Sequence, residues 1–261
     1  RMGLGMIFHI TPSNIPTNFS TSLIFGLLTG NSNIVKVPSK KFDEIDIICS
    51  VINSILNKKK FKKIKNRILI VRYKNNDSFT REISLKCDAR IIWGGNLTIN
   101  SVRKFELNER AREITFSDRY SLCVINFDKL PKNNKDIYKK LALDFYNDTY
   151  LVDQNACSSP HVIFWMGKNN LEIRNKFWKT FSKIVDLRYK LDHSAIFYKQ
   201  DRLFSDFIKK NNIKNFKKYG DAIYCVELNQ KKIDPSKLIS RWGYFYEVEI
   251  SKLEELSKFS N

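Results

Sequence analysis

The part of the chain best suited to chemistry runs from Asp153 to His161 and reads Asp-Gln-Asn-Ala-Cys-Ser-Ser-Pro-His. It is polar and rich in small residues, and the apolar run Val162–Trp165 after it predicts a buried strand. A cysteine just before a buried strand, among side chains small enough to let a substrate approach, is a candidate nucleophile. The alternative is that Cys157 is a small core hydrophobe, as most lone cysteines are.

The composition limits the classes of protein that need to be considered. The chain has 261 residues, of which 43% are hydrophobic, enough for one large or two ordinary domains. Its five cysteines are widely spread without a CxxC pair, which predicts free thiols in a reducing, cytoplasmic compartment. The three histidines are too scattered to predict a metal site. No apolar run reaches the roughly 20 residues that a membrane-spanning helix needs, so we expect no span.

The formal net charge of +19 raises the question of nucleic-acid binding. The basic residues are spread along the whole chain and accompany many Asn and Ile residues, which fits a general compositional bias as well as a binding face. We therefore consider a nucleic-acid partner unlikely. A positive field also favours polyanionic small molecules, such as a phosphorylated dinucleotide or coenzyme A.

The first 120 residues alternate between predicted strands and predicted helices. This order predicts a parallel sheet with crossover helices, and hence a Rossmann-like open α/β domain over residues 1–120. Such sheets bind ligands beyond the carboxyl ends of their strands, where three polar turns fall, at residues 11–14, 36–39 and 93–96. There is no GxGxxG motif. The expected strands are 3–10, 33–37, 67–73 and 89–93, and the expected helices 17–28, 42–56, 77–86 and 97–107.

Residues 121–261 form a second predicted α/β domain, which carries Cys157. Its last helix begins at Ser251 as N-cap, with Glu254 at the capping-box position. The expected strands are 121–127, 162–165, 222–228 and 244–250, and the expected helices 135–150, 171–191, 203–212 and 251–259.

Five short motifs occur in an order that resembles the aldehyde dehydrogenase superfamily. They are His-Ile-Thr-Pro-Ser-Asn at 9–14, Thr-Gly-Asn at 29–31, Ile-Val-Lys-Val-Pro-Ser at 34–39, Trp-Gly-Gly-Asn at 93–96 and Asp-Gln-Asn-Ala-Cys-Ser-Ser-Pro at 153–160. The last is most similar to the acyl-CoA reductase branch typified by the bacterial luminescence fatty-acid reductase (LuxC-type). The resemblance covers residues 3–165. It implies that Cys157 is the nucleophile and that the Asn14 amide, with the backbone N–H of Cys157, stabilises the oxyanion, one such donor contributing ~3 kcal/mol.

The same resemblance implies a dinucleotide site on the first domain. Lys36 would hold the adenosine ribose hydroxyls, although a lysine at a strand end can also simply extend its ammonium group into solvent. Ser39 stands where NAD-preferring relatives commonly have a glutamate that repels a 2′-phosphate, so we expect NADPH. The implied cofactor-binding residues are Thr11, Pro12, Ser13, Lys36, Pro38, Ser39, Gly94, Gly95 and Asn96.

One departure from the superfamily pattern points to the direction of the reaction. The glutamate that activates hydrolytic water in aldehyde-oxidising relatives is replaced by Phe116, and the nearest acid is Asp118. An acyl-cysteine without that base hydrolyses slowly, as a reductase requires. We therefore expect reduction of an acyl-CoA or acyl-protein to an aldehyde through acyl-Cys157. The alternative is a non-catalytic acyl- or dinucleotide-binding subunit of a multienzyme reductase complex.

Two further hypotheses concern the neighbourhood of the cysteine and the extent of the chain. His161 either promotes ionisation of the thiol or only packs beside it. Residues 241–244 (Arg-Trp-Gly-Tyr) weakly resemble a late superfamily segment. We therefore expect a piece truncated at both ends, which at full length forms a homo-oligomer or a multienzyme complex.

Overall fold

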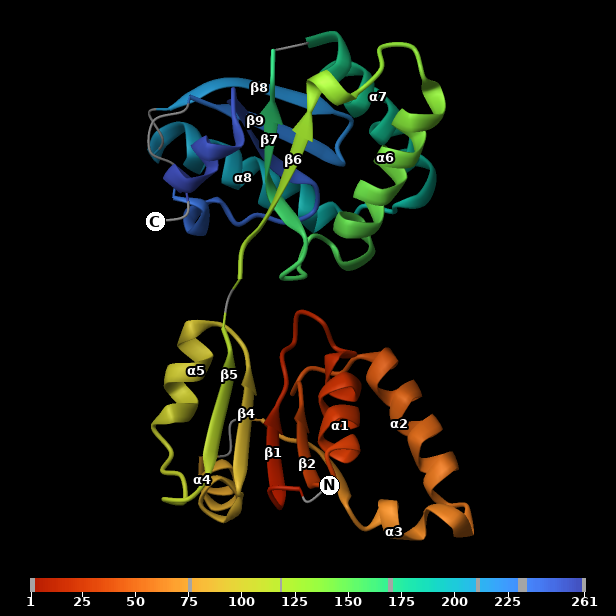
Figure 1. Cartoon of the computed structure of the whole chain (residues 1–261), viewed down its shortest axis with the longest axis vertical. Helices are drawn as coiled ribbons and strands as arrows, with labels where there is room; N and C mark the ends of the chain where they lie inside the picture. Colours follow the sequence, from red (N-terminus) through yellow and green to blue (C-terminus); the bar gives the residue numbers. More distant parts are fainter. Residues whose placement is uncertain are drawn as a thin grey trace. The chain divides into compact units, whose positions relative to one another are not determined.

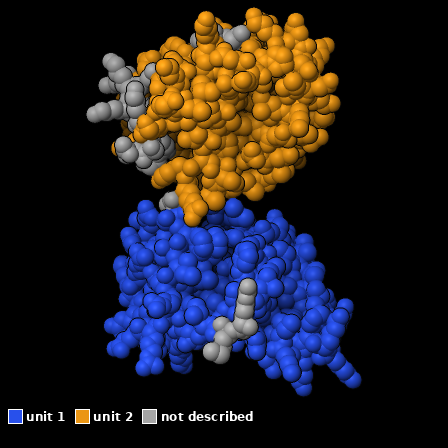
Figure 2. All heavy atoms as spheres, in the orientation of Figure 1, with its two compact units in different colours: residues 1–118 blue, residues 119–261 orange. Residues whose placement is uncertain are grey.

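The computed structural model describes residues 3–74, 77–117, 119–168, 171–209, 212–229 and 234–259 (Figure 1). The chain divides into two compact units, residues 1–118 and 119–261, coloured separately in Figure 2. Each unit has its own five-stranded sheet and is described by itself. No helix in these described ranges is long and apolar enough to cross a bilayer.

The sheet of the first unit is parallel throughout, with strand order β3-β2-β1-β4-β5. The chain starts in the centre, builds outward through β2 and β3, and then crosses to the other side of β1 to form β4 and β5 (Figure 1). The order therefore reverses between β1 and β4, which is where open α/β sheets bind ligands. The strands are β1 (Met6–Ile10), β2 (Ser32–Val37), β3 (Ile68–Arg72), β4 (Ala89–Trp93) and β5 (Arg112–Phe116).

Helices cover both faces of this sheet. On one face α1 (Asn18–Leu28) and α2 (Asp43–Leu56) bury a cluster made of Phe19, Leu23, Val35, Val37 and Ile45. On the other face α4 (Asp77–Lys86) and α5 (Asn96–Arg103) bury Phe8, Ile10, Ile83, Cys87, Ile92, Ile99 and Val102. The lysine-rich run after α2 forms the short turns η1 (Lys59–Phe61) and α3 (Lys62–Lys65), which lead to β3.

The sheet of the second unit has strand order β6-β7-β10-β9-β8. Strands β6, β7, β10 and β9 are parallel, and β8 is antiparallel to β9. The late strand β10 is inserted between β7 and β9, so the centre of the sheet combines segments far apart in sequence. The strands are β6 (Ser121–Asn126), β7 (Pro160–Met166), β8 (Ile213–Tyr219), β9 (Ile223–Leu228) and β10 (Tyr244–Ile250).

Two cores lie on the two faces of this second sheet. Helices α6 (Lys135–Thr149) and α7 (Leu171–Arg188) close an aromatic core that includes Phe145, Trp165, Phe177, Trp178, Phe181 and Phe245. The opposite core contains Val162, Phe164, Tyr244 and Tyr246, with Leu203 of α8 (His193–Lys209) packed against it. The 3₁₀ turns are η2 (Phe127–Lys129), η3 (Tyr150–Val152), η4 (Pro235–Leu238) and η5 (Leu253–Phe259).

The fold class predicted from the sequence is confirmed, because both units are α/β with mostly parallel sheets. Several element predictions were wrong. Strands β5 and β8 were not predicted, because charged residues interrupt their short sequences, whereas the edge strands β3 and β6 are mostly apolar and were predicted. Helix α5 ends at Arg103 rather than at Leu107, and α8 begins at His193 rather than at Leu203.

Apolar periodicity misplaced the start of α8 and gave the wrong type for the last segment. Helix α8 exposes Phe197, Phe204 and Ile208, so its apolar residues do not mark a single buried face. The last segment is a 3₁₀ turn rather than an α-helix, and Glu255 instead of Glu254 accepts the N–H groups of Ser251 and Lys252.

Candidate functional site

The loop that carries Cys157 connects η3 to the amino end of β7 in the second unit. Asp153 and Gln154 both adopt the left-handed conformation, with φ of 52° and 59°. Non-glycine residues rarely adopt this conformation, and it persists only where the surroundings hold it. The loop is therefore a constrained feature, and its hydrogen bonds show what constrains it.

Gln154 is the anchor of this loop. Its side chain is 1% exposed. Nε2 donates to the carbonyl oxygens of Pro160 (3.0 Å) and Tyr244 (3.3 Å), and Oε1 accepts the backbone N–H of Gly243 at 3.1 Å. One amide thus ties the loop to the first residues of two central strands, β7 and β10.

Asp153 adds two more attachments. Its backbone carbonyl accepts the N–H of Trp242 at 3.2 Å, and its carboxylate accepts the hydroxyl of Tyr189 at 2.5 Å. Gly243 has φ of 79°, and a Cβ there would overlap the hydroxyl of Tyr150. The turn at 241–243 therefore packs tightly beneath the cysteine loop.

Cys157 differs from the other four thiols. It is exposed, whereas Cys49 and Cys123 are half-buried and Cys87 and Cys225 are buried. Burial raises the pKa of Cys87 and of Cys123 to about 11, and it also raises the pKa of Cys49 and of Cys225. A thiol held in the protonated form is a poor nucleophile, so reactivity at these four positions is suppressed.

His161 lies four residues after Cys157 and is buried. Burial lowers its pKa to about 4, with a further contribution from the charge of Arg241. Its Nδ1 accepts the backbone N–H of Ser240 at 3.3 Å. The ring is therefore neutral near pH 7 and brings no positive charge to the cysteine loop.

The expected cofactor residues lie at the carboxyl ends of three neighbouring strands of the first unit. Thr11 follows β1, and its hydroxyl and N–H both bind the carbonyl of Lys36, at 2.8 and 3.1 Å. Pro12 is half-buried, while Ser13 and Asn14 are exposed. Gly94 and Gly95 follow β4, and Asn96 is the first residue of α5. The sheet therefore brings the turns after β2, β1 and β4 to one edge, at the point where the strand order reverses.

Lys36 and Ser39 lie at the end of β2 and just after it. The Lys36 ammonium lies 4.9 Å from the centre of the Tyr73 ring, and burial lowers the pKa of this lysine. Pro38 is buried and Ser39 is exposed. Charges of both signs follow Ser39 in the sequence. Lys40 and Lys41 come directly after it, and the first turn of α2 then carries three acidic residues, Asp43, Glu44 and Asp46. Asp46 is paired with Arg72 at 2.7 Å.

The position expected to hold a water-activating glutamate is Phe116, the last residue of β5. Its ring stacks on Trp93, with ring centres 3.8 Å apart. The stacked ring is apolar and cannot accept a proton. Asp118 lies outside the described residues.

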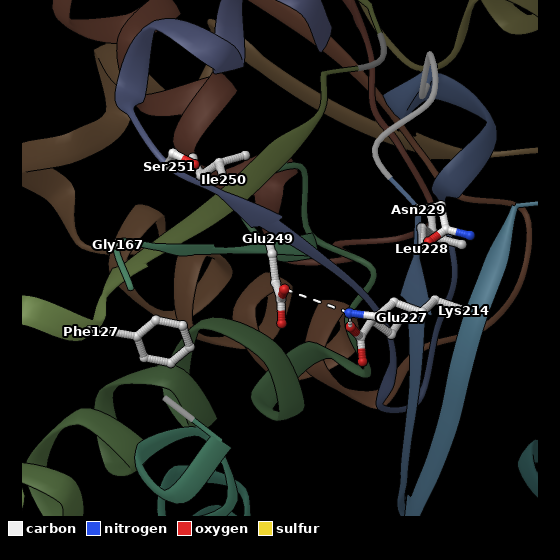
Figure 3. Close-up of a pocket in the computed structure, with 9 residues that line it drawn as sticks. All are labelled: Phe127, Gly167, Lys214, Glu227, Leu228, Asn229, Glu249, Ile250 and Ser251. Atoms are coloured by element: carbon white, nitrogen blue, oxygen red, sulfur yellow. Dashed lines mark ion pairs between the residues drawn. The ribbon is translucent and has the colours of Figure 1, made fainter. Parts of the chain in front are cut away.

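A cavity of about 420 Å³ lies at the carboxyl ends of the parallel strands of the second unit, beside the amino end of the antiparallel β8 (Figure 3). Lys214 reaches across it to Glu227 (2.6 Å) and Glu249 (3.6 Å). Gly167 follows β7 and lines this cavity, whereas Cys157 precedes β7, so the two features belong to opposite ends of the strand. None of the sequence-predicted site residues lines it.

A buried ion cluster extends from the same two glutamates. Arg174 of α7 binds Glu247 at 2.7 Å, Glu227 at 3.2 Å and Glu249 at 3.3 Å. The indoles of Trp165 and Trp178 donate to Glu247. Across the described ranges, no group of three His, Cys, Asp or Glu side chains could hold a metal ion.

The structure thus groups the predicted cofactor residues on one edge of the first sheet and places Cys157 on an anchored loop of the second unit. No role was predicted for Gln154, Tyr189 or Ser121, although all three hold the loop. The sequence did contain an indication for Gln154. A long amide side chain within a motif of small residues must find hydrogen-bond partners if it is buried.

Comparison with known structures identifies the fold. The chain superimposes on a putative aldehyde dehydrogenase from Burkholderia cenocepacia with a TM-score of 0.69 and 12% identity, covering 100% of this chain and 55% of that one. It also superimposes on the Mycobacterium tuberculosis aldehyde dehydrogenase complexed with NAD⁺, with a TM-score of 0.68 and 9% identity, covering 99% and 55%. The fold is therefore that of the aldehyde dehydrogenases.

Sequence comparison narrows this class to one family. Residues 1–190 match the family model of acyl-CoA reductase (LuxC), so the chain belongs to that family. It is similar to a long-chain acyl-protein thioester reductase from Aliivibrio fischeri, at 21% identity over 265 aligned positions. The match covers 98% of this chain and 51% of the relative, so the chain spans about half the length of the curated relative it matches.

Proposed function

We propose that this protein reduces an acyl thioester to an aldehyde, with Cys157 carrying the acyl group and NADPH as reductant. The observation that carries the proposal is the exposed Cys157 on a strained loop held by a buried amide, in a chain of the acyl-CoA reductase family. The other four thiols are less exposed, and burial raises the pKa of each of them. Cys157 is therefore the one best placed for nucleophilic attack.

In the proposed first step the Cys157 thiolate attacks the thioester carbonyl. The donor thiol leaves, and the acyl group stays on Sγ as a new thioester. Asn14 remains the predicted side-chain donor to the oxyanion, and Asn14→Ala is expected to slow acylation ~100-fold. In the second step a hydride adds to the acyl carbon, the bond from that carbon to Sγ breaks, the aldehyde leaves, and the Cys157 thiolate is restored.

The edge of the first sheet formed by Thr11–Asn14, Lys36–Ser39 and Gly94–Asn96 fits a dinucleotide. It combines a strand-order reversal, the exposed loop residues Ser13 and Ser39, and the N-terminus of α5 after two glycines. Bound there, the cofactor supplies the hydride. Ser39 has no charge with which to repel a 2′-phosphate, and Lys40 and Lys41 follow it, which supports NADPH over NADH.

Phe116 supports reduction rather than oxidation to an acid. A phenyl ring stacked on Trp93 offers no base for hydrolytic water, so an acyl-cysteine would persist long enough to accept a hydride. The name of the Aliivibrio relative supports an acyl-protein as donor, beside the acyl-CoA suggested by the family name.

The experiment that tests this function measures aldehyde formation and NADPH oxidation with acyl-CoA and acyl-protein donors. Cys157→Ala is expected to abolish both, whereas Cys49→Ala, which alters a half-buried thiol, is expected to retain them. A wild-type protein that binds NADPH or acyl-CoA without turnover would instead establish a binding subunit.

A further inference from the structure

The first residue of β6 makes direct contact with the cysteine loop. The Ser121 hydroxyl donates a hydrogen bond to the backbone carbonyl of Cys157 at 2.7 Å. The register of β6 against β7 shifts at this point, because Ser121 pairs with Pro160 and Leu122 with Val162, so that His161 is left out. Such a bulge changes the direction of nearby side chains and is often found next to active sites.

The residues on either side of Cys157 are held by other groups. The N–H of Ser159 binds the carbonyl of Ala156 at 3.0 Å, and the Ser159 hydroxyl binds the carbonyl of Asp148 at 2.7 Å. Among the residues that the structure describes, Cys157 makes a single hydrogen bond, which its carbonyl accepts from Ser121. Ser121 therefore sets the orientation of the peptide group that follows the nucleophile.

We propose that Ser121 is a positioning residue for Cys157, a role that rests on the proposed function of this cysteine as nucleophile. Holding the carbonyl of Cys157 limits rotation about its Cα–C bond, and so limits the directions in which the thiol of an exposed loop residue can point. Without the hydroxyl, the loop samples more orientations, and a smaller fraction of them presents the thiol to an incoming electrophile. Ser121 does not touch the reacting atoms, so it acts only through Cys157.

The test compares pairs of variants that differ in the hydroxyl alone. Ser121→Ala removes it, Ser121→Thr keeps it, and Ser121→Val matches Thr in shape without it. The rates to measure are alkylation of Cys157 by iodoacetamide and its acylation by acyl-CoA, both followed by peptide mass. Ser182→Ala, which removes a hydroxyl bonded to Asp186 on α7, is the control.

We expect Ser121→Ala and Ser121→Val to slow both reactions about 3- to 10-fold, the range that one net hydrogen bond supplies. Ser121→Thr should stay within ~2-fold of wild type, and the Val protein should be less stable than the Thr protein by no more than the one hydrogen bond, about 0.5–1.5 kcal/mol. If one variant does not fold, the remaining pair still compares hydroxyl with no hydroxyl at the same position.

Equal rates for Thr and Val, or wild-type rates for Ala, would overturn the positioning role. Alkylation keeps this result separate from the proposed function, because it needs no acyl transfer. If wild type takes up no acyl group while alkylation shows the expected pattern, the proposed function fails and the positioning role stands.

Discussion

Replacing Gln154 with leucine tests whether one buried amide holds the cysteine loop. The substitution keeps the approximate size of the side chain and removes three hydrogen bonds, to Pro160, Tyr244 and Gly243. At about 0.5–1.5 kcal/mol net for each bond, the free energy of unfolding should fall by about 1.5–4.5 kcal/mol. The left-handed residues of the loop then lose their support, so Cys157 should also react more slowly with acyl-CoA.

The assay is urea unfolding followed by tryptophan fluorescence, because Trp165, Trp178 and Trp242 lie in the second unit and only Trp93 lies in the first. Gln200→Leu, at an exposed position of α8, is the matched control and should change stability by less than ~0.5 kcal/mol. A Gln154→Leu protein as stable as wild type would show that these three bonds do not anchor the loop.

Three other predictions address charge. Lys199 is fully buried, and burial lowers its pKa to about 7, so above that pH the unfolded chain binds one more proton than the folded chain. The free energy of unfolding should therefore rise with pH by up to about 1.4 kcal/mol per unit between pH 7 and 10. Lys199→Met should remove this rise when unfolding is measured at pH 7 and 9. Arg174→Met leaves buried glutamates without their counter-charge and should cost about 3–5 kcal/mol in urea unfolding, unlike the exposed Arg188→Met, and an equal effect of both would contradict the buried cluster. Ser39→Glu should change the kcat/KM ratio of NADPH to NADH at least ~10-fold toward NADH, and an unchanged ratio would exclude this position as the discriminator.

The order of strands and helices was predictable because buried parallel strands are nearly continuous apolar runs, as at residues 162–166. Of the four edge strands, β3 and β6 were predicted, whereas β5 and β8 were not. Strand β8, for example, is stabilised by pairing with β9, while its own side chains are mostly charged or exposed. The short motifs predicted which loops carry chemistry, but not how the cysteine loop is held.

That support comes from contacts across the fold. Gln154 reaches Tyr244, ninety residues later, and Ser121 reaches Cys157 across thirty-six residues. Local sequence carries no record of such pairs, because the first arises when β10 enters between β7 and β9 and the second when β6 pairs with β7. The Lys214 cavity was not predicted either, since its two glutamates alternate within segments that otherwise predict ordinary strands.

The central claim is that Cys157 carries the acyl group, and the mass of the intact protein after incubation with acyl-CoA tests it most directly. We predict a single added acyl mass on wild type, none on Cys157→Ala, and loss of the adduct with release of aldehyde when NADPH is added. An adduct of the same mass on Cys157→Ala, or an adduct that NADPH leaves in place, would contradict the account.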